Sequence, residues 1–245
     1  MHENPPSRRP SLRIAGLLLL FTAIPAIPAT PARAGQPAVA PTPPGVPVRP
    51  QPPESEGAET WQRSYEREAA GQLAEALAAL DALPPGKKGE YLALARRGWL
   101  LYRLGRADAA VDAYQRAVAA APQAVEARVG LLLPLSTLRR WNELVTAAKE
   151  VLNIEPRNYY GTLRLAFAHY NLGHFADAGT LYAQLKQGYP SDLEVRSGLG
   201  WSLLKQGKTA DAAREFRELL SVSPRHALGR QGLDAALARH DPAAH

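Results

Sequence analysis

The side chains best suited to acid–base or metal chemistry in this sequence are six histidines and a scattered set of carboxylates. They do not stand in a spacing that builds a known active site, because the sequence contains neither an H-E-x-x-H zinc motif nor a G-x-S-x-G nucleophile motif. The segment Gly198-Leu199-Gly200 lacks the further glycines and the lysine of a phosphate-binding loop. We therefore expect a protein that is not an enzyme and that has no catalytic residue, cofactor or metal ion.

Cysteine chemistry is excluded outright, because the chain contains no cysteine. Disulfides, thiolate metal sites, thiol catalysis and a lipid anchor on an N-terminal cysteine cannot form. The chain is basic, with 29 lysines and arginines against 23 aspartates and glutamates. Several of the arginines lie within residues 1–34, so the remainder is close to neutral and gives no reason to expect a nucleic-acid partner.

Residues 1–34 resemble an export signal. Arg8 and Arg9 begin a positively charged segment, an apolar run starts at Ile14, and the sequence A-R-A before residue 35 fits a signal-peptidase cleavage site. The apolar run is shorter than the roughly 20 residues that span a bilayer, although a retained N-terminal anchor is the alternative. A general secretory signal is favoured over a twin-arginine signal, because Ser11 stands where the latter has an aromatic residue. We expect a periplasmic or otherwise exported bacterial protein.

A proline-rich linker is predicted for residues 35–56, since eight prolines fall within residues 35–53. Prolines at this density exclude helix and sheet and predict an extended spacer. We favour a disordered tether for this segment. A docking site for a proline-binding module is the alternative.

Four prolines stand 34 residues apart, at Pro122, Pro156, Pro190 and Pro224. Other residue types recur with the same period. We number the positions of each 34-residue unit from 1 to 34 so that residue 91 is position 1 of its unit and the four prolines are at position 32. The residues at position 15 are Gly71, Gly105, Arg139, Gly173 and Gly207, and those at position 24 are Leu80, Tyr114, Ala148, Tyr182 and Phe216. A glycine that adopts a left-handed conformation and a proline that cannot continue a helix are typical of a repeated helix–turn–helix.

This pattern resembles the tetratricopeptide repeat family, whose 34-residue unit is a helix–turn–helix with small, aromatic and proline residues at these positions. The resemblance implies an all-α, right-handed superhelical solenoid of about five stacked units, because a single unit cannot bury its apolar face alone. The units would span residues 57–90, 91–124, 125–158, 159–192 and 193–226. A C-terminal capping helix is predicted for residues 227–240, followed by a tail at 241–245.

The third unit departs from the pattern at two positions. Arg139 replaces the glycine of the turn, and Pro134 lies inside the expected first helix. A proline in a helix interior removes a backbone hydrogen bond and costs about 3 kcal/mol or produces a kink. We favour a bend that packing absorbs, without a functional role. A kink or hinge is the alternative.

The resemblance also implies where a partner would bind, since the family lines a concave groove with repeat positions 2, 5, 6, 9, 12 and 13 of each first helix. These positions are rich in aromatic and basic residues, which contribute most of the binding energy at interfaces. The predicted groove residues are Trp61, Tyr65, Arg96, Trp99, Tyr102, Arg103, Leu163, Arg164, Phe167, Tyr170, Asn171, Trp201 and Lys205. The alternative is that the aromatic residues at position 9 belong to the core. His169, at a position that the family usually fills with a core aromatic, is expected to be a packed imidazole rather than a ligand.

The leading hypothesis for function is an exported scaffold that holds an extended or helical protein segment in this groove during assembly of a cell-envelope complex. The two-carboxylate clamp that some family members use for C-terminal peptides is disfavoured, because positions 6 and 9 hold no asparagine. The alternative is a glycan-binding adaptor of an exopolysaccharide synthesis or secretion system. We expect protein partners or a polysaccharide, no nucleic acid, and membrane contact only during export or at the periphery. Self-assembly is left open.

Overall fold

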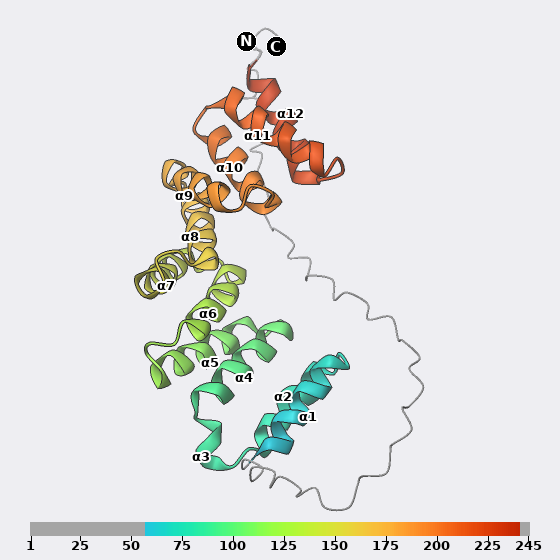
Figure 1. The fold of residues 1–245 in the computed structure, drawn as a ribbon, viewed down its shortest axis with the longest axis vertical. Helices are drawn as coiled ribbons and strands as arrows, with labels where there is room; N and C mark the ends of the chain where they lie inside the picture. The colour runs from blue at the N-terminus through green and yellow to red at the C-terminus, as the bar shows by residue number, and fades with distance from the viewer. Residues whose placement is uncertain (1–56, 241–245) are drawn as a thin grey trace, which may run out of the picture. The chain divides into compact units, whose positions relative to one another are not determined.

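Helices form throughout residues 57–240, the part of the chain that the computed structural model describes (Figure 1). Within that range the elements are α1 (Ala58–Ala69), α2 (Leu73–Ala79), the 3-10 turn η1 (Leu80–Ala82), α3 (Pro85–Lys88), α4 (Tyr91–Arg103), α5 (Ala107–Ala120), α6 (Val125–Thr137), α7 (Trp141–Ile154), α8 (Tyr159–Asn171), α9 (Phe175–Gly188), α10 (Leu193–Lys205), α11 (Thr209–Val222) and α12 (Ala227–His240). No helix among these described residues is long and apolar enough to cross a membrane. The predicted export signal (1–34), linker (35–56) and tail (241–245) lie outside the described residues.

Successive helices pack as hairpins that follow one another from α1 to α12 (Figure 1). α4 packs on α5, α6 on α7, α8 on α9 and α10 on α11, and each second helix packs on the first helix of the next hairpin. The first helices also contact one another, α4 with α6, α6 with α8, and α8 with α10. α12 closes the series by packing on α10 and α11. The arrangement matches the predicted all-α solenoid with a C-terminal capping helix.

Each hairpin turns at a residue with a left-handed backbone. Gly71, Gly105, Gly173 and Gly207 have φ between 75° and 85°, and Arg139 at the same repeat position has φ 56°. This conformation is easy for glycine but costs about 1–2 kcal/mol for a residue with a Cβ. The third unit therefore makes the same turn as its neighbours with a strained arginine.

Glycines in the first helices let the aromatic rings of position 24 approach the helix backbone. A Cβ added to Gly98 would lie 2.9 Å from the Tyr114 ring, and one added to Gly130, in the next unit, would lie 2.4 Å from it. Ordinary carbon–carbon contacts are about 3.5–4.0 Å, so the ring occupies the space of both missing side chains. The same contacts join Phe216 to Gly200 and Gly232, and Tyr182 to Gly198. Each ring thereby fastens its own unit to the following one.

The third and the first units depart from the repeat pattern, but each still forms a helical hairpin. α6 is as long as α4, 13 residues, although Pro134 lies inside it. The Leu138 N–H donates to the Pro134 carbonyl at 2.9 Å, so the helix continues past the proline. In the first unit the second helix ends early, because α2 gives way to η1 and the chain becomes extended at Leu83.

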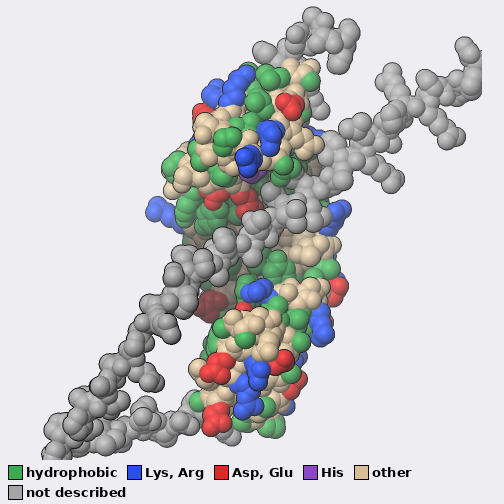
Figure 2. All heavy atoms as spheres, turned by 90° about the vertical axis from the view of Figure 1, so that its right-hand side faces the viewer, with side chains coloured by type: hydrophobic (Ala, Val, Ile, Leu, Met, Phe, Trp, Pro, Cys, Tyr) green, Lys and Arg blue, Asp and Glu red, His purple; other side chains and the backbone are tan. Residues whose placement is uncertain are grey.

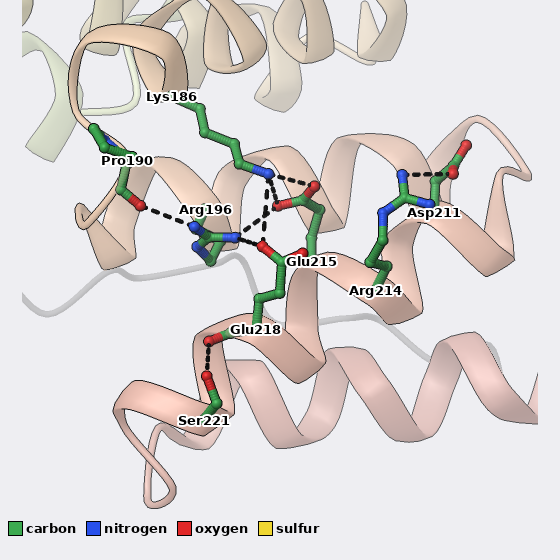
Figure 3. Close-up of polar contacts among 8 residues, drawn as sticks. All are labelled: Lys186, Pro190, Arg196, Asp211, Arg214, Glu215, Glu218 and Ser221. Atoms are coloured by element: carbon green, nitrogen blue, oxygen red, sulfur yellow. Dashed lines mark hydrogen bonds and ion pairs between the residues drawn. The ribbon is translucent and has the colours of Figure 1, made fainter.

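A buried carboxylate ties α9, α10 and α11 together (Figure 3). Glu215 of α11 accepts hydrogen bonds from Lys186 Nζ of α9 at 2.7 and 2.8 Å and from Arg196 Nη1 of α10 at 3.3 Å. Arg196 also pairs with Glu218 and donates to the Pro190 carbonyl at 2.8 Å. Because two cations face two carboxylates, the charge that is removed from water is compensated and the network fixes the fourth unit against the fifth.

Candidate partner-binding surface

The predicted groove residues all lie on the first helices of their hairpins, and the structure divides them into two groups. The first group lies on α1 and α4 and comprises Trp61, Tyr65, Arg96, Trp99, Tyr102 and Arg103. The second lies on α8 and α10 and comprises Leu163, Arg164, Phe167, Tyr170, Asn171, Trp201 and Lys205. α6, which contacts both α4 and α8, stands between the two groups.

The first group is organised around Glu68 of α1, which was not among the predicted groove residues. Trp99 Nε1 donates to Glu68 Oε1 at 2.6 Å, and Arg103 Nη1 lies 3.4 Å from the same oxygen. Arg96 pairs with the other oxygen of this carboxylate. One acidic residue thus orients three of the predicted groove side chains of α4 against α1.

Arg96 is held in place rather than offered to solvent. It is only 8% exposed, and its guanidinium donates to Ser64 Oγ at 3.3 Å and to the Ser64 carbonyl at 3.0 Å. The guanidinium carbon lies 3.9 Å from the centroid of the Tyr65 ring, which is a cation–π contact. Arg96 therefore supports the Tyr65 ring, and Glu68 already compensates its charge.

Arg103 is the cation of this group that faces solvent. Its side chain is 42% exposed, and its guanidinium carbon lies 5.3 Å from the centroid of the Trp99 ring. Glu68 meets two arginines and compensates one of them, so the group has a surplus positive charge beside exposed aromatic surface. This combination suits an acidic or carboxylate-bearing ligand with an apolar anchor.

The pKa of the Glu68 carboxyl group is lowered from its ordinary value. Burial raises its pKa, but the hydrogen bonds from Trp99 and Arg96, with the charges of Arg96 and Arg103, outweigh burial and lower the pKa. The network is therefore complete at neutral pH and depends on this negative charge.

Exposed apolar side chains lie on α1, α4 and α8. Tyr65 is 54% exposed, whereas Trp61, Trp99 and Tyr102 are half-buried. Leu92 of α4 and Tyr160 of α8 are 64% and 54% exposed, and neither was among the predicted groove residues. Both occupy repeat position 2, which the family uses for its groove, so the repeat numbering alone could have identified them.

The second group is more buried than the first. Leu163, Arg164, Phe167 and Trp201 are at most 8% exposed, while Tyr170, Asn171 and Lys205 are half-buried. The Phe167 ring meets Trp141 of α7 edge-on at 5.6 Å, the Trp201 ring meets Phe216 of α11 at 5.5 Å, and Arg164 Nη1 lies 3.4 Å from Glu194 Oε1. That these residues bind a partner stays a prediction.

Repeat position 6 alternates between arginine and glycine from the second unit to the fifth. It holds Arg96, Gly130, Arg164 and Gly198 in successive units. The glycines follow units with a tyrosine at position 24, whose ring takes the space of their side chain. The arginines follow units with a leucine or alanine at position 24, where that space is left for a longer side chain.

Two hollows formed by described residues lie elsewhere on the surface. One, of about 420 Å³, is lined by α5, α6 and α7, and the other, of about 320 Å³, mainly by α2 and α4. Neither is lined by a predicted groove residue. Figure 2 shows one face of the molecule, where basic and acidic side chains are interspersed among apolar ones. On the part of this face that the structure describes, neither sign of charge forms a broad field of its own.

A group of possible metal ligands lies at the turn between α8 and α9. The Nδ1 atoms of His169 and His174 are 3.2 Å apart, and a carboxylate oxygen of Asp177 joins them in a cluster whose ligand atoms lie within 4.8 Å of one another. Burial lowers the pKa of His169; the Asp177 carboxylate opposes this, and the charges of His174 and Lys149 add to it. The sequence had predicted no metal ligand here.

Comparison with known proteins agrees with the repeat. One model of the tetratricopeptide repeat matches residues 63–125 and 197–245, and a second model of the same repeat matches residues 162–192. Together these ranges cover more than half of the chain. The chain belongs to the tetratricopeptide repeat family. No curated protein matches the sequence.

Solved tetratricopeptide repeat structures share the fold. A tetratricopeptide repeat protein from Parabacteroides merdae superposes with a TM-score of 0.67 at 17% identity, over 74% of this chain and 72% of that one. MamA superposes with a TM-score of 0.63 at 13% identity, over 70% and 94% of the two chains. YrrB, described as having an unusual peptide-binding site, gives 0.63 at 14% identity, over 71% and 90%. At these identities the likeness shows the fold alone, and it confirms the predicted tetratricopeptide repeat solenoid.

Proposed function

We propose that this tetratricopeptide repeat protein is a scaffold that binds an extended or helical protein segment along the face of its first helices. The observation that carries the proposal is that groove positions of three first helices hold exposed apolar or aromatic side chains, Tyr65 of α1, Leu92 of α4 and Tyr160 of α8. The exposed Arg103 guanidinium lies against the Trp99 ring at another such position. Exposed rings and arginines of this kind are what interfaces use as anchors. The fold itself is a scaffold for protein–protein interaction, which agrees with the proposal.

The chemistry of the first group favours a segment with an apolar side chain and a nearby carboxylate. Tyr65 is stacked under Arg96, and Trp99 is hydrogen-bonded to Glu68, so both rings are held before a partner arrives. Rings that are already ordered lose little conformational entropy on binding. Arg103 would pair with the carboxylate, because the negative charge of Glu68 is shared with Arg96.

The structural neighbours support a peptide ligand only by analogy. YrrB carries the same fold and is described as having a peptide-binding site. Its sequence is 14% identical to this chain, so its binding residues cannot be transferred. What the analogy supports is that a solenoid of this kind can carry a peptide-binding site.

The proposed location of this function is the bacterial cell envelope, where the scaffold would assist assembly of a multi-protein complex. This part rests on the export-signal pattern of residues 1–34 and the proline-rich spacer at 35–56. Glycan binding in an exopolysaccharide system is the competing outcome, since aromatic rings also stack on sugars.

Site-specific photo-crosslinking in cells that export the protein tests the proposal. A photoreactive phenylalanine analogue replaces Tyr65, and the matched control carries it at Tyr189, which is 46% exposed but lies at a junction between units. We expect a discrete protein adduct at Tyr65 and none at Tyr189. Equal labelling at both positions, or none at either, would contradict the proposal. A carbohydrate adduct at Tyr65 would instead favour glycan binding.

A further inference from the structure

We propose that His169, His174 and Asp177 bind a divalent transition-metal ion at the turn between α8 and α9. His169 lies in the last turn of α8, His174 immediately precedes α9, and Asp177 lies in the first turn of α9. Gly173, with φ 85°, makes the turn that brings the two histidines together. The proposal is independent of the partner-binding surface, because none of these three residues belongs to it.

The separation of the two imidazoles fits a shared ion. The two Nδ1 atoms are 3.2 Å apart, and the ring centroids are 5.5 Å apart. Two nitrogens bound tetrahedrally to Zn²⁺ at about 2.0–2.1 Å are about 3.3–3.4 Å apart. The histidines therefore stand at nearly the required distance. The ligand atoms of the whole cluster, including a carboxylate oxygen of Asp177, lie within 4.8 Å of one another.

The donor set indicates the class of ion. Neutral imidazole nitrogens and one carboxylate oxygen suit Zn²⁺ and related borderline ions, whereas Mg²⁺ and Ca²⁺ prefer oxygen ligands. Four residues separate the histidines, which is within the H-x3–5-H spacing of zinc sites. His174 and Asp177 are exposed, so a fourth position is open to water.

The charges around the site are mixed. Asp177 supplies a negative charge; the carboxyl end of α8 favours a cation through its helix dipole, and the amino end of α9 opposes one in the same way. Lys149 of α7 is close enough to oppose a cation, although its side chain is exposed and therefore screened by solvent. The metal would join the end of α8 to the start of α9 and so brace the turn of the fourth unit.

A hydrogen bond between the two histidines without any metal is the competing interpretation, and the fifth unit supplies the control. Asp211 occupies the same place in α11 as Asp177 in α9. It pairs with Arg214 at 2.8 Å, and Lys208 stands where the fourth unit has His174. An acidic residue in the first turn is thus a shared feature, but only the fourth unit surrounds it with histidines.

The test is calorimetric titration of the full, untagged chain with Zn²⁺, repeated with Co²⁺ to read the coordination from its visible absorption. We expect one equivalent of Zn²⁺ to bind and to raise the melting temperature. His174→Ala and Asp177→Asn should each weaken binding by at least about tenfold. Asp211→Asn should bind like the wild type, and so should a double variant, His240→Gln with His245→Gln, that removes the C-terminal histidines.

The outcomes separate the interpretations. Zn²⁺ affinity that is unchanged in His174→Ala, or that disappears with the C-terminal histidines, would overturn the site. The same holds if the wild-type chain binds no Zn²⁺. His174 makes no side-chain capping hydrogen bond to α9, so its alanine variant should fold and keep the comparison valid. A circular dichroism spectrum like that of the wild type would check this.

Discussion

The contact between Gly198 and Tyr182 allows one prediction to be worked out in detail. A Cβ added to Gly198 would lie 2.3 Å from Tyr182 Cζ, whereas ordinary carbon contacts are about 3.5–4.0 Å. The Tyr182 ring is 2% exposed and packs among Leu163, Leu185 and their neighbours, so it cannot move away from a new methyl group without disturbing them. Overpacking costs about 1–3 kcal/mol, and the better helix propensity of alanine recovers about 1 kcal/mol. We expect Gly198→Ala to lower the free energy of unfolding by about 1 kcal/mol, and by no more than about 2 kcal/mol.

A double-mutant cycle isolates the contact. In a Tyr182→Leu background the ring atoms nearest the new methyl group are absent, so Gly198→Ala should become neutral or stabilising, with a coupling energy of about 2 kcal/mol. Gly188, at the exposed end of α9 with nothing within 4 Å of an added Cβ, is the matched control, and its alanine variant should gain up to about 1 kcal/mol. Chemical unfolding followed by circular dichroism measures all the variants. Effects of Gly198→Ala and Tyr182→Leu that add within about 0.5 kcal/mol would refute the reasoning.

Other variants test separate features of the solenoid. Arg139→Gly should raise the free energy of unfolding by about 1 kcal/mol, because glycine relieves the left-handed strain at φ 56°; a lower melting temperature would contradict this. Glu215→Gln should lower the free energy of unfolding by about 2–3 kcal/mol, since Lys186 and Arg196 lose the negative charge of a buried carboxylate. A change within about 0.5 kcal/mol would show that the network does not stabilise the fold. Because the pKa of Glu68 is lowered in the folded protein, its carboxylate stabilises the fold fully above the pKa of the unfolded chain, about 4.3. This stabilisation is lost as the pH falls from that value through the folded pKa. Acid titration should therefore change tryptophan emission, through Trp99, in the wild type but much less in Glu68→Gln; equal changes in both would refute this.

The repeat and the turns could be predicted from the sequence because each unit imposes the same requirements. The proline spacing fixed the length of the unit, and the glycines at position 15 marked the turns that the structure places at positive φ. Arg139 shows the limit of residue type as a guide. Its position in the repeat predicted the left-handed turn better than its identity did.

The partner-binding surface was predicted less completely, because contacts between units decide it. Glu68 organises Arg96 and Trp99 from the preceding unit, and a list of aromatic and basic positions does not reveal such an acidic residue. The choice of arginine or glycine at position 6 depends on the ring in the unit before it, which only packing makes visible. The approach of His169 to His174 depends on the exact turn at Gly173, and the linear sequence shows only their spacing.

The central claim is that the face of the first helices binds the partner. The most direct test is the dissociation constant of the crosslinked partner segment for Arg103→Ala, compared with Arg116→Ala on the second helix α5, where the arginine is also exposed. We predict that Arg103→Ala weakens binding by at least about tenfold, because it removes the solvent-facing cation beside Trp99, while Arg116→Ala stays within about twofold of the wild type. Equal dissociation constants for the two variants, or a larger loss for Arg116→Ala, would contradict the account.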